Sequence, residues 1–403
     1  MPLPTVLCAY EFGAGLGHIN RLVEVARHLP DQARLVFALP DPGLGTKVIG
    51  ETFGKRATLI QGVHWKPPED PNTRNIPTLT FADVLRLFSF DDVQVLRHQA
   101  SRWRNIIAEV KPTVILGDFA PALRIAALER IPMVVVGNGY TIPPPNRLLP
   151  PMRPWNDYVP PNSRANEGYI LTAANKVSEA IGGKAIDYIS NLFYGEHAFV
   201  CTLPEFDPYH NFRLEPTAWP FNIPRIEVGP MHARRKGPSV FIYLAKDHPA
   251  LRSVVAAAGK LKTKVSIYVQ GANPEHVAKI CASNLTIHSR PADLAAVLPN
   301  TTLLIHHAGL GTGYAGLMAG VPQLVFPLNL EHQITARGLH AFGTSVSIST
   351  KALPSAEQIS TEFKRFLSDG LRQKAAIKVA VDLERRRVED PVRPVVTALK
   401  SYL

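Results

Sequence analysis

The sequence predicts an α/β protein made of two doubly wound domains, each with a mostly parallel sheet. The first sign is an apolar strand at 5–10, which leads through a glycine-rich turn into a segment whose apolar residues recur every three or four positions. The second is a similar strand–glycine turn–helix unit that begins at Leu303. The third is the length of 403 residues, which exceeds one ordinary core and suits two.

In the first half, apolar runs and helical patterns continue to alternate, as expected for parallel strands joined by helices. We expect further strands at 34–39, 113–117, 132–136 and 198–202, and helices at 81–90, 92–110, 120–130 and 168–193. The segment 67–77 is rich in proline and polar residues and is predicted to be a loop. Together these elements place the first domain at residues 1–228.

A basic, glycine- and proline-containing segment at 229–238 is predicted to be an interdomain linker. A new apolar strand then opens a second domain at 239–385. Its strands are expected at 240–244, 264–269, 303–305 and 323–326. The tail at 386–403 keeps a helical pattern, so the sequence predicts that it forms a final helix.

The formal net charge of +11 allows three interpretations. One is a basic enzyme whose substrates are anionic. Another is attraction to an anionic membrane surface that carries the substrate. Nucleic-acid binding is the least favoured, because the basic residues are scattered and no nucleic-acid module is recognisable. We therefore expect no nucleic-acid partner.

The cellular compartment can be predicted from targeting signals and from the number of cysteines. No run approaches the ~18–20 apolar residues of a membrane span, and the N-terminus lacks a basic region and a small-residue cleavage pattern. Three widely spaced cysteines fit a reducing compartment and exclude a zinc cluster built on cysteine pairs. The sequence predicts a cytoplasmic protein, with peripheral attachment to the cytoplasmic face of a membrane left open. A monomer and a homodimer fit equally.

The stretch 303–336 carries the most informative chemistry. After its apolar strand come the candidate phosphate-binding residues His307, Gly309, Gly311, Thr312 and Gly313. A helix that begins after such a turn offers free backbone N–H groups to a phosphate, and glycines let the backbone approach closely. Glu331 follows the next strand and can accept hydrogen bonds from sugar hydroxyls. A nucleotide diphosphate-sugar is the simplest ligand for this arrangement.

This stretch resembles the donor-site signature of bacterial family-1 glycosyltransferases of the GT-B fold. The residues that carry the resemblance are His307, Gly309, Gly311, Thr312, Gly320-Val321-Pro322, Pro327 and Glu331. The family pattern has glycine at the place of Ala308, and glutamine at the place of His332, which Gln333 follows here. The resemblance implies two facing Rossmann-like domains, a donor sugar held by Glu331 with His332 and Gln333, and a final helix at 386–403 that crosses back to the first domain.

A candidate acid–base pair lies in the first domain. His18 follows the first glycine turn, and Asp118 ends another predicted strand, so both should lie at the carboxyl edge of the sheet, where open α/β domains bind ligands. A neutral imidazole can take a proton from a hydroxyl, and a neighbouring carboxylate fixes its tautomer. By resemblance, Gly17-His18 carries the catalytic histidine and Asp118 orients it. The rival interpretations are a structural histidine and a helix N-cap.

The resemblance implies an inverting transfer of the sugar from a UDP- or dTDP-sugar, which is a co-substrate, with no cofactor and no metal. Two residues stand where the chain departs from the family. Lys246 lies where the second domain's first strand usually ends in Gly-Ser, so it is a candidate for contact with phosphate. The plant-type tryptophan that stacks on the base has no counterpart near Arg290, so Arg290 is the candidate to border the base.

Residues 142–161 are dense in proline, which excludes a regular helix or a central strand. A plain linker is one interpretation. We favour a wall of the acceptor cleft, because Met152, Trp155 and Tyr158 give the segment more apolar surface than a solvated linker needs. The acceptor's class stays open between a small molecule, a lipid and a saccharide.

Three other functions agree with parts of the sequence but are disfavoured. Glycines at 13, 15 and 17 suggest a dinucleotide site, but histidine replaces the third glycine of G-x-G-x-x-G, which disfavours an oxidoreductase. A nucleotide-sugar epimerase of the same architecture would need an acid–base pair aimed at the donor sugar, and no strong pair is evident. A catalytically silent GT-B partner protein would not need both a candidate acid–base pair and a candidate donor site.

Overall fold

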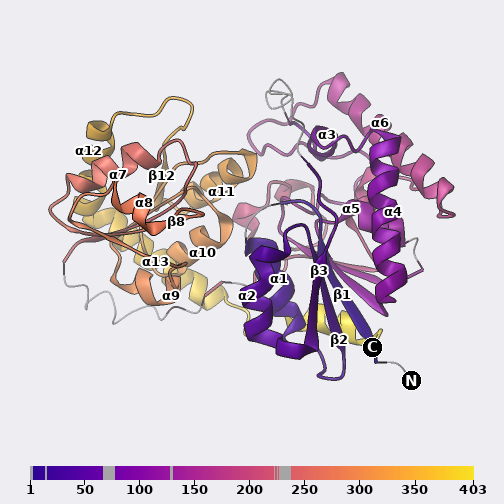
Figure 1. Cartoon of the computed structure of the whole chain (residues 1–403). Helices are drawn as coiled ribbons and strands as arrows, with labels where there is room; N and C mark the ends of the chain where they lie inside the picture. The colour runs from indigo at the N-terminus through magenta and orange to yellow at the C-terminus, as the bar shows by residue number, and fades with distance from the viewer. Residues whose placement is uncertain are drawn as a thin grey trace. The chain divides into compact units, whose positions relative to one another are not determined.

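The computed structural model describes residues 3–13, 16–66, 78–127, 130–221, 223–224, 226 and 237–403 (Figure 1). The chain divides into two compact units: Met1–Asn222 together with Glu389–Leu403, and Ile223–Val388. The predicted loop at 67–77 lies outside the described residues. So does the predicted linker at 229–238, apart from its last two residues.

Six parallel strands form the sheet of the first unit, in the order β3-β2-β1-β4-β5-β6. Their bounds are β1 Thr5–Tyr10, β2 Arg34–Leu39, β3 Ala57–Gln61, β4 Val114–Asp118, β5 Met133–Gly137 and β6 His197–Val200. Every residue of β1, β4 and β5 is buried, as expected for the central strands of a parallel sheet covered by helices.

The helices of the first unit are α1 Leu16–Ala26, α2 Pro42–Phe53, α3 Phe81–Leu87, α4 Val93–Val110, α5 Pro121–Ala127, α6 Pro161–Ala180 and α14 Arg393–Lys400. The helix predicted at 168–193 was wrong in its extent. It begins earlier and ends at Ala180, and Gly182 then takes a φ of +79°, which favours glycine. A separate 3₁₀ turn forms at Ile189–Phe193.

The second unit has a sheet of the same size, with the parallel order β12-β11-β10-β7-β8-β9. Its strands are β7 Ser239–Ala245, β8 Lys264–Gln270, β9 Leu285–Ile287, β10 Leu303–His306, β11 Gln323–Val325 and β12 Ser345–Ser347. Its helices are α7 Leu251–Gly259, α8 Pro274–Ala278, α9 Leu294–Val297, α10 Leu310–Met318, α11 Leu330–Ala341, α12 Ala356–Ser368 and α13 Gly370–Arg386.

The two sheets share one topology. Counted along the chain within each unit, both read 3-2-1-4-5-6, so the prediction of two doubly wound domains with parallel sheets is confirmed. In this topology the crevice for a ligand opens at the carboxyl ends of the first and fourth strands, where the winding reverses. We call the end of β1 and β4 the first switch point, and the end of β7 and β10 the second switch point.

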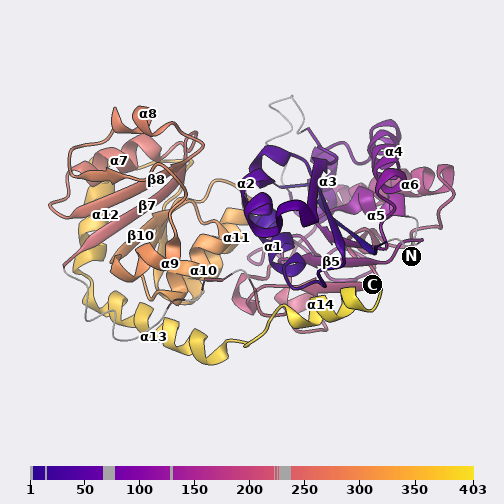
Figure 2. The ribbon, with the colours of Figure 1, turned by 60° about the horizontal axis from the view of Figure 1, so that its bottom comes forward.

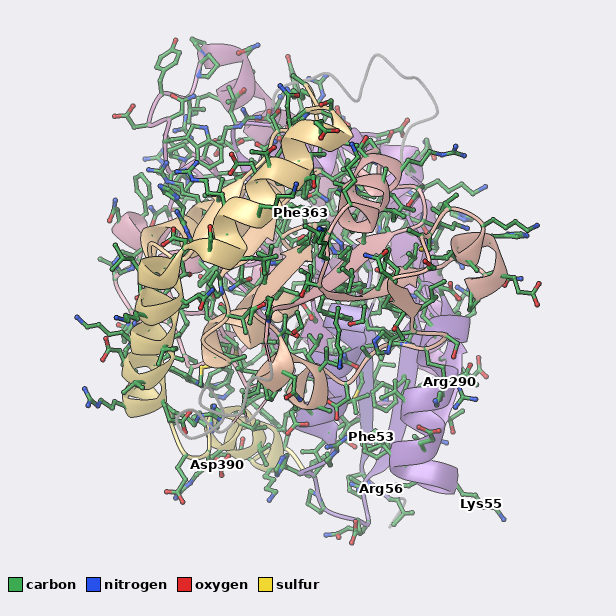
Figure 3. The ribbon with its side chains drawn as sticks, turned by 90° about the vertical axis from the view of Figure 1, so that its left-hand side faces the viewer. Phe53, Lys55, Arg56, Arg290, Phe363 and Asp390 are labelled. Atoms are coloured by element: carbon green, nitrogen blue, oxygen red, sulfur yellow. The ribbon has the colours of Figure 1, made fainter. Side chains whose placement is uncertain are left out.

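Apolar side chains of late helices complete both cores. Helix α14, close to the end of the chain, lies on the first unit (Figure 2), where Val395 and Leu399 are buried in the same core as Val6 of β1. In the second unit, Phe363 lies on the inner side of α12 (Figure 3) and is fully buried against the strands. Among the described residues, no helix has the length and apolarity needed to cross a bilayer.

Candidate active site

The first switch point brings together the two residues predicted as a pair. His18 lies in the first turn of α1, and Asp118 is the last residue of β4, which pairs with β1. Nδ1 of His18 is 3.0 Å from Oδ2 of Asp118, although the angle does not suit a strong hydrogen bond. Catalytic pairs commonly align fully only when substrate binds. The distance therefore suits an imidazole oriented by a carboxylate.

Arg21 shares the same carboxylate oxygen. It lies three residues after His18 on α1, and its Nη1 donates a hydrogen bond to Oδ2 of Asp118. Burial opposes the ionisation of Asp118, but the charge of Arg21 and the contact with His18 outweigh burial and hold its pKa below the ordinary value. Asp118 is therefore a carboxylate at neutral pH.

Two neighbours orient the His18 ring. The Tyr10 ring stacks on it, with centroids 5.0 Å apart and planes 12° from parallel. On another side, Nε2 faces the backbone of Gly13, whose φ is +103° and where a Cβ atom would overlap the ring nitrogen. Since Nδ1 faces Asp118, Nε2 is the nitrogen that can accept a proton, and Gly13 leaves room beside it.

Strained backbone follows Asp118 directly. Phe119 has a φ of +52°, a conformation that bulky residues seldom adopt and that costs about 1–3 kcal/mol. Its carbonyl accepts hydrogen bonds from the N–H groups of Glu11 and Phe12, at 3.3 and 3.4 Å. These bonds tie the loop after β1 to the loop after β4, and so help to hold His18 near Asp118.

A second buried carboxyl lies near the first switch point. Glu11 is 2% exposed, and it accepts hydrogen bonds from Nε1 of Trp65 at 2.8 Å and from the N–H of Leu123 at 2.6 Å. Burial raises the pKa of Glu11 to about 7, although these hydrogen bonds oppose the rise. Glu11 thus fastens the end of β1 to the start of α5.

The second switch point exposes a helix N-terminus. Gly309 is the N-cap of α10, and no side chain in the described part of the chain caps it. The first N–H groups of a helix have no partner within it. The prediction is wrong for one donor, because the N–H of Gly313 already bonds to the carbonyl of Gly309 at 2.9 Å. The N–H groups of Gly311 and Thr312 are the ones available to a phosphate.

Three histidines lie around this terminus. The rings of His307 and His332 are 4.9 Å apart, and Nε2 of the buried His248 is 3.0 Å from the carbonyl of Phe326. Burial, together with the neighbouring histidines, lowers the pKa of His307 to about 4 and that of His332 to about 3. Burial also lowers the pKa of His248. At neutral pH these rings are uncharged. His248 is occupied at both nitrogens, because Nε2 donates to the carbonyl of Phe326 and Nδ1 accepts from the N–H of Ala250 at 3.2 Å. His307 and His332 are therefore the rings that can donate a hydrogen bond to an anion.

His306 faces away from His307, because neighbouring strand residues point to opposite faces. It is fully buried, and its Nε2 is 2.9 Å from Oε1 of Gln323. Its Nδ1 accepts a hydrogen bond from the N–H of Ala308 at 3.2 Å. Ala308, which stands where the family pattern has glycine, has a φ of +66° that favours glycine. His306 therefore supports the loop before α10 from within.

The other predicted donor residues lie on neighbouring loops. Glu331, His332 and Gln333 form the first turn of α11, which Asn329 caps through the N–H of His332 at 2.9 Å. Lys246 is exposed after β7, and its stem lies beside Gly271, next to the end of β8. The structure thus places Lys246 on the β8 side of β7, whereas His307 lies on the β10 side.

Arg290 follows β9, at the same edge of the second sheet. It lines a shallow pocket of about 420 Å³ together with His288, Pro291 and Asp293. Arg290 is exposed. A planar cation beside a pocket of this size suits a flat ring such as a nucleobase.

The predicted acceptor residues differ in exposure. Trp155 is 41% and Tyr158 is 64% exposed, in a segment without helix or strand. Met152 is fully buried, and its N–H donates to the carbonyl of Leu79 at 2.8 Å. The prediction that Met152 contacts a ligand is therefore wrong for this structure, because its apolar side chain is packed in the core. Only the two aromatic rings present a surface.

Arg21 and His248 were missed by sequence reasoning. The sequence could have indicated Arg21, because it lies three residues after His18 and residues at that spacing share a helix face. Nothing in the sequence indicated His248, because it lies in a polar turn and only the tertiary structure brings it close to the site. Among the described residues, no group of three or more His, Cys, Asp or Glu side chains could hold a metal ion.

Comparisons with known proteins extend this description. Residues 252–396 match the family model of the erythromycin biosynthesis protein CIII-like C-terminal domain. A PGL/p-HBAD biosynthesis glycosyltransferase of Mycobacterium tuberculosis is 22% identical over 320 residues, which cover 72% of this chain and 71% of that protein. A 3-alpha-mycarosylerythronolide B desosaminyl transferase of Saccharopolyspora erythraea is 23% identical over 134 residues, 33% of this chain and 31% of that protein.

Solved structures share the fold along the whole chain. Glycosyltransferase VinC in complex with dTDP has a TM-score of 0.66 at 16% identity, covering 99% of both chains. Spinosyn rhamnosyltransferase SpnG with spinosyn aglycone has a TM-score of 0.65 at 20% identity, covering 97% of this chain and 99% of that one.

The fold and the comparisons define a glycosyltransferase of the GT-B fold, as the sequence predicted. These comparisons support the resemblance to bacterial family-1 glycosyltransferases. The second unit carries most of the matched C-terminal domain.

Proposed function

We propose that the chain transfers a sugar from a UDP- or dTDP-sugar to a hydroxyl of an apolar small molecule, with inversion at the anomeric carbon. The observation that carries the proposal is the buried contact between His18 and Asp118 at the first switch point. The dTDP and aglycone bound by two structural neighbours support these classes of donor and acceptor. The exposed rings of Trp155 and Tyr158 support an apolar acceptor.

In the proposed step, a lone pair of the acceptor oxygen forms a bond to the anomeric carbon. The bond from that carbon to the diphosphate breaks, and its electron pair leaves with the diphosphate. The acceptor proton moves to Nε2 of His18, and Asp118 stabilises the resulting imidazolium. Metal is not required for this step.

The second unit holds the donor in this proposal. The N–H groups of Gly311 and Thr312 and the neutral ring of His307 stabilise the charge that develops on the diphosphate. Glu331, with His332 and Gln333 in the same helical turn, bonds to the sugar hydroxyls. Arg290 borders the base, and Lys246 adds positive charge at the same edge of the sheet.

The test begins with donors. The purified chain is warmed with UDP-, dTDP- and GDP-sugars, and a bound donor should raise the melting temperature. Transfer to apolar hydroxyl compounds, with lipid and saccharide acceptors alongside, is then measured, and the anomeric configuration of the product is read by NMR.

The decisive variant is His18→Ala, with the exposed His28→Ala as the matched control. We expect His18→Ala to lower the transfer rate by about 10²–10⁴-fold, the usual contribution of a general base, and to keep the thermal shift with donor. Near-full transfer by a folded His18→Ala protein would exclude His18 as the base. A new sugar nucleotide formed from donor alone would indicate an epimerase instead.

A further inference from the structure

We propose that Arg21 is a positioning residue of the acid–base pair: it holds the Asp118 carboxylate in place and makes His18 a weaker base than an imidazole–carboxylate pair alone. This inference rests on the proposed function, because it assumes that His18 accepts the proton of the acceptor.

The geometry points to competition for one atom. Nδ1 of His18 and Nη1 of Arg21 both contact Oδ2 of Asp118. The other oxygen, Oδ1, is buried and has no hydrogen-bond partner among the described residues. An oxygen that accepts a hydrogen bond from a guanidinium has less electron density to offer an imidazolium. Arg21 therefore reduces the stabilisation that Asp118 gives to protonated His18.

Burial makes this competition effective. The Arg21 side chain is 7% exposed and the Asp118 side chain is fully buried, so water and salt screen their charges little. Without Arg21, the Asp118 carboxylate would be buried beside a neutral imidazole, and burial would favour its protonated form. Arg21 thus keeps Asp118 ionised while it limits the basicity of His18.

Two titratable neighbours of the pair, Tyr10 and Cys201, stay uncharged near neutral pH. Burial raises the pKa of Tyr10, on β1, to about 12, with Asp41 and Asp118 adding to the rise. Burial also raises the pKa of Cys201, after β6, to about 12. Tyr10 and Cys201 therefore do not titrate in a pH profile measured between pH 5 and 9. Burial raises the pKa of Glu11 to about 7, so its titration falls inside this range, and the profile is compared with that of Glu11→Gln.

The test uses Arg21→Met and Arg21→Lys in the full chain, with the exposed Arg27→Met as the matched control. For Arg21→Met we expect a kcat about 10–100-fold lower. We also expect the acidic limb of the kcat/KM profile to move to higher pH by about one unit, because a positive charge near the imidazole is gone. The donor KM and the thermal shift with dTDP should not change. Arg21→Lys keeps the charge but loses the planar fork, so it should restore the profile and only part of kcat.

If Arg21→Met does not fold, a double-mutant cycle still tests the proposal. Arg21→Lys should lower kcat in the wild-type background and have little further effect in Asp118→Asn, because the shared partner is gone. An equal effect in both backgrounds, or an unmoved acidic limb in Arg21→Met, would overturn the proposal. If instead His18→Ala keeps transfer activity, the proposed function itself fails, whatever Arg21 does.

Discussion

The two switch points occupy the same place in the same strand order, yet they hold opposite kinds of chemistry. The first holds an ionised carboxylate, Asp118, between Arg21 and an imidazole. The second holds histidines that burial keeps uncharged, beside the open N-terminus of α10. Topology thus places a crevice at the same edge of both sheets, and the side chains after the strands give one crevice a charged pair and the other uncharged hydrogen-bond donors.

After His18→Ala, the largest effect on the first switch point is expected from Gly13→Ala. A methyl group there overlaps Nε2 of His18, and the φ of +103° strains any side chain. We expect kcat to fall by about 10²-fold or more, because a displaced catalytic group loses its alignment. Steady-state kinetics checks this, with Gly17→Ala as the control because its Cβ would meet nothing within 4 Å. Unchanged kcat in Gly13→Ala would contradict the assignment of Nε2.

The second switch point should be sensitive to acid. Burial lowers the pKa of His306 to about 3, so the unfolded state binds more protons below the ordinary value near 6.5. Stability present at neutral pH is therefore lost as pH falls, by about 2 kcal/mol between pH 6.5 and 4.5. In His306→Gln this loss should be smaller. Urea unfolding monitored by hydrogen exchange of β10 measures it, and equal pH dependence in both proteins would refute the account.

The first switch point should respond to pH with the opposite sign. The pKa of Glu11 is raised to about 7, so the folded state binds more protons than the unfolded state above pH 4.5. Its stability contribution is present at low pH and is lost as pH rises through 7, by about 2 kcal/mol between pH 5 and 7. Glu11→Gln should flatten this slope in urea unfolding followed at β1, whereas exposed Glu51→Gln should not. A slope unchanged by Glu11→Gln would mean that the carboxyl is not buried as described.

The smallest of these effects concerns the donor. His307→Ala should weaken the binding of dTDP or UDP by about tenfold, the value of one hydrogen bond to a charged group. Calorimetric titration measures the dissociation constant, and the exposed His276→Ala serves as the control. An unaltered dissociation constant in His307→Ala would remove His307 from the phosphate site.

The positions of many elements and candidate residues could be predicted from local sequence patterns. The strand, glycine turn and helix around His18 predicted where that residue lies, and the strand at 113–117 predicted the position of Asp118. The repeated glycines predicted the N-terminus of α10. These predictions succeeded because parallel strands put their carboxyl ends at one edge, whatever the distance between them in the sequence.

The roles of some side chains could not be predicted from the sequence, because they depend on how the chain packs. Met152 looked like a ligand contact, but the fold uses its side chain as core. Gly313 looked like a phosphate donor, but its N–H is used by the first turn of the helix. The sharing of Asp118 between His18 and Arg21 depends on side-chain directions that no periodicity encodes.

We propose that the first switch point moves the proton and that the second holds the donor. This proposal is tested most directly by the single-turnover transfer rate of His18→Ala at saturating donor, with the dTDP dissociation constant measured on the same sample. We expect a rate at least about 10²-fold lower, with a dissociation constant close to that of the wild type. A wild-type rate, or a loss of dTDP binding as large as the loss of rate, would contradict it.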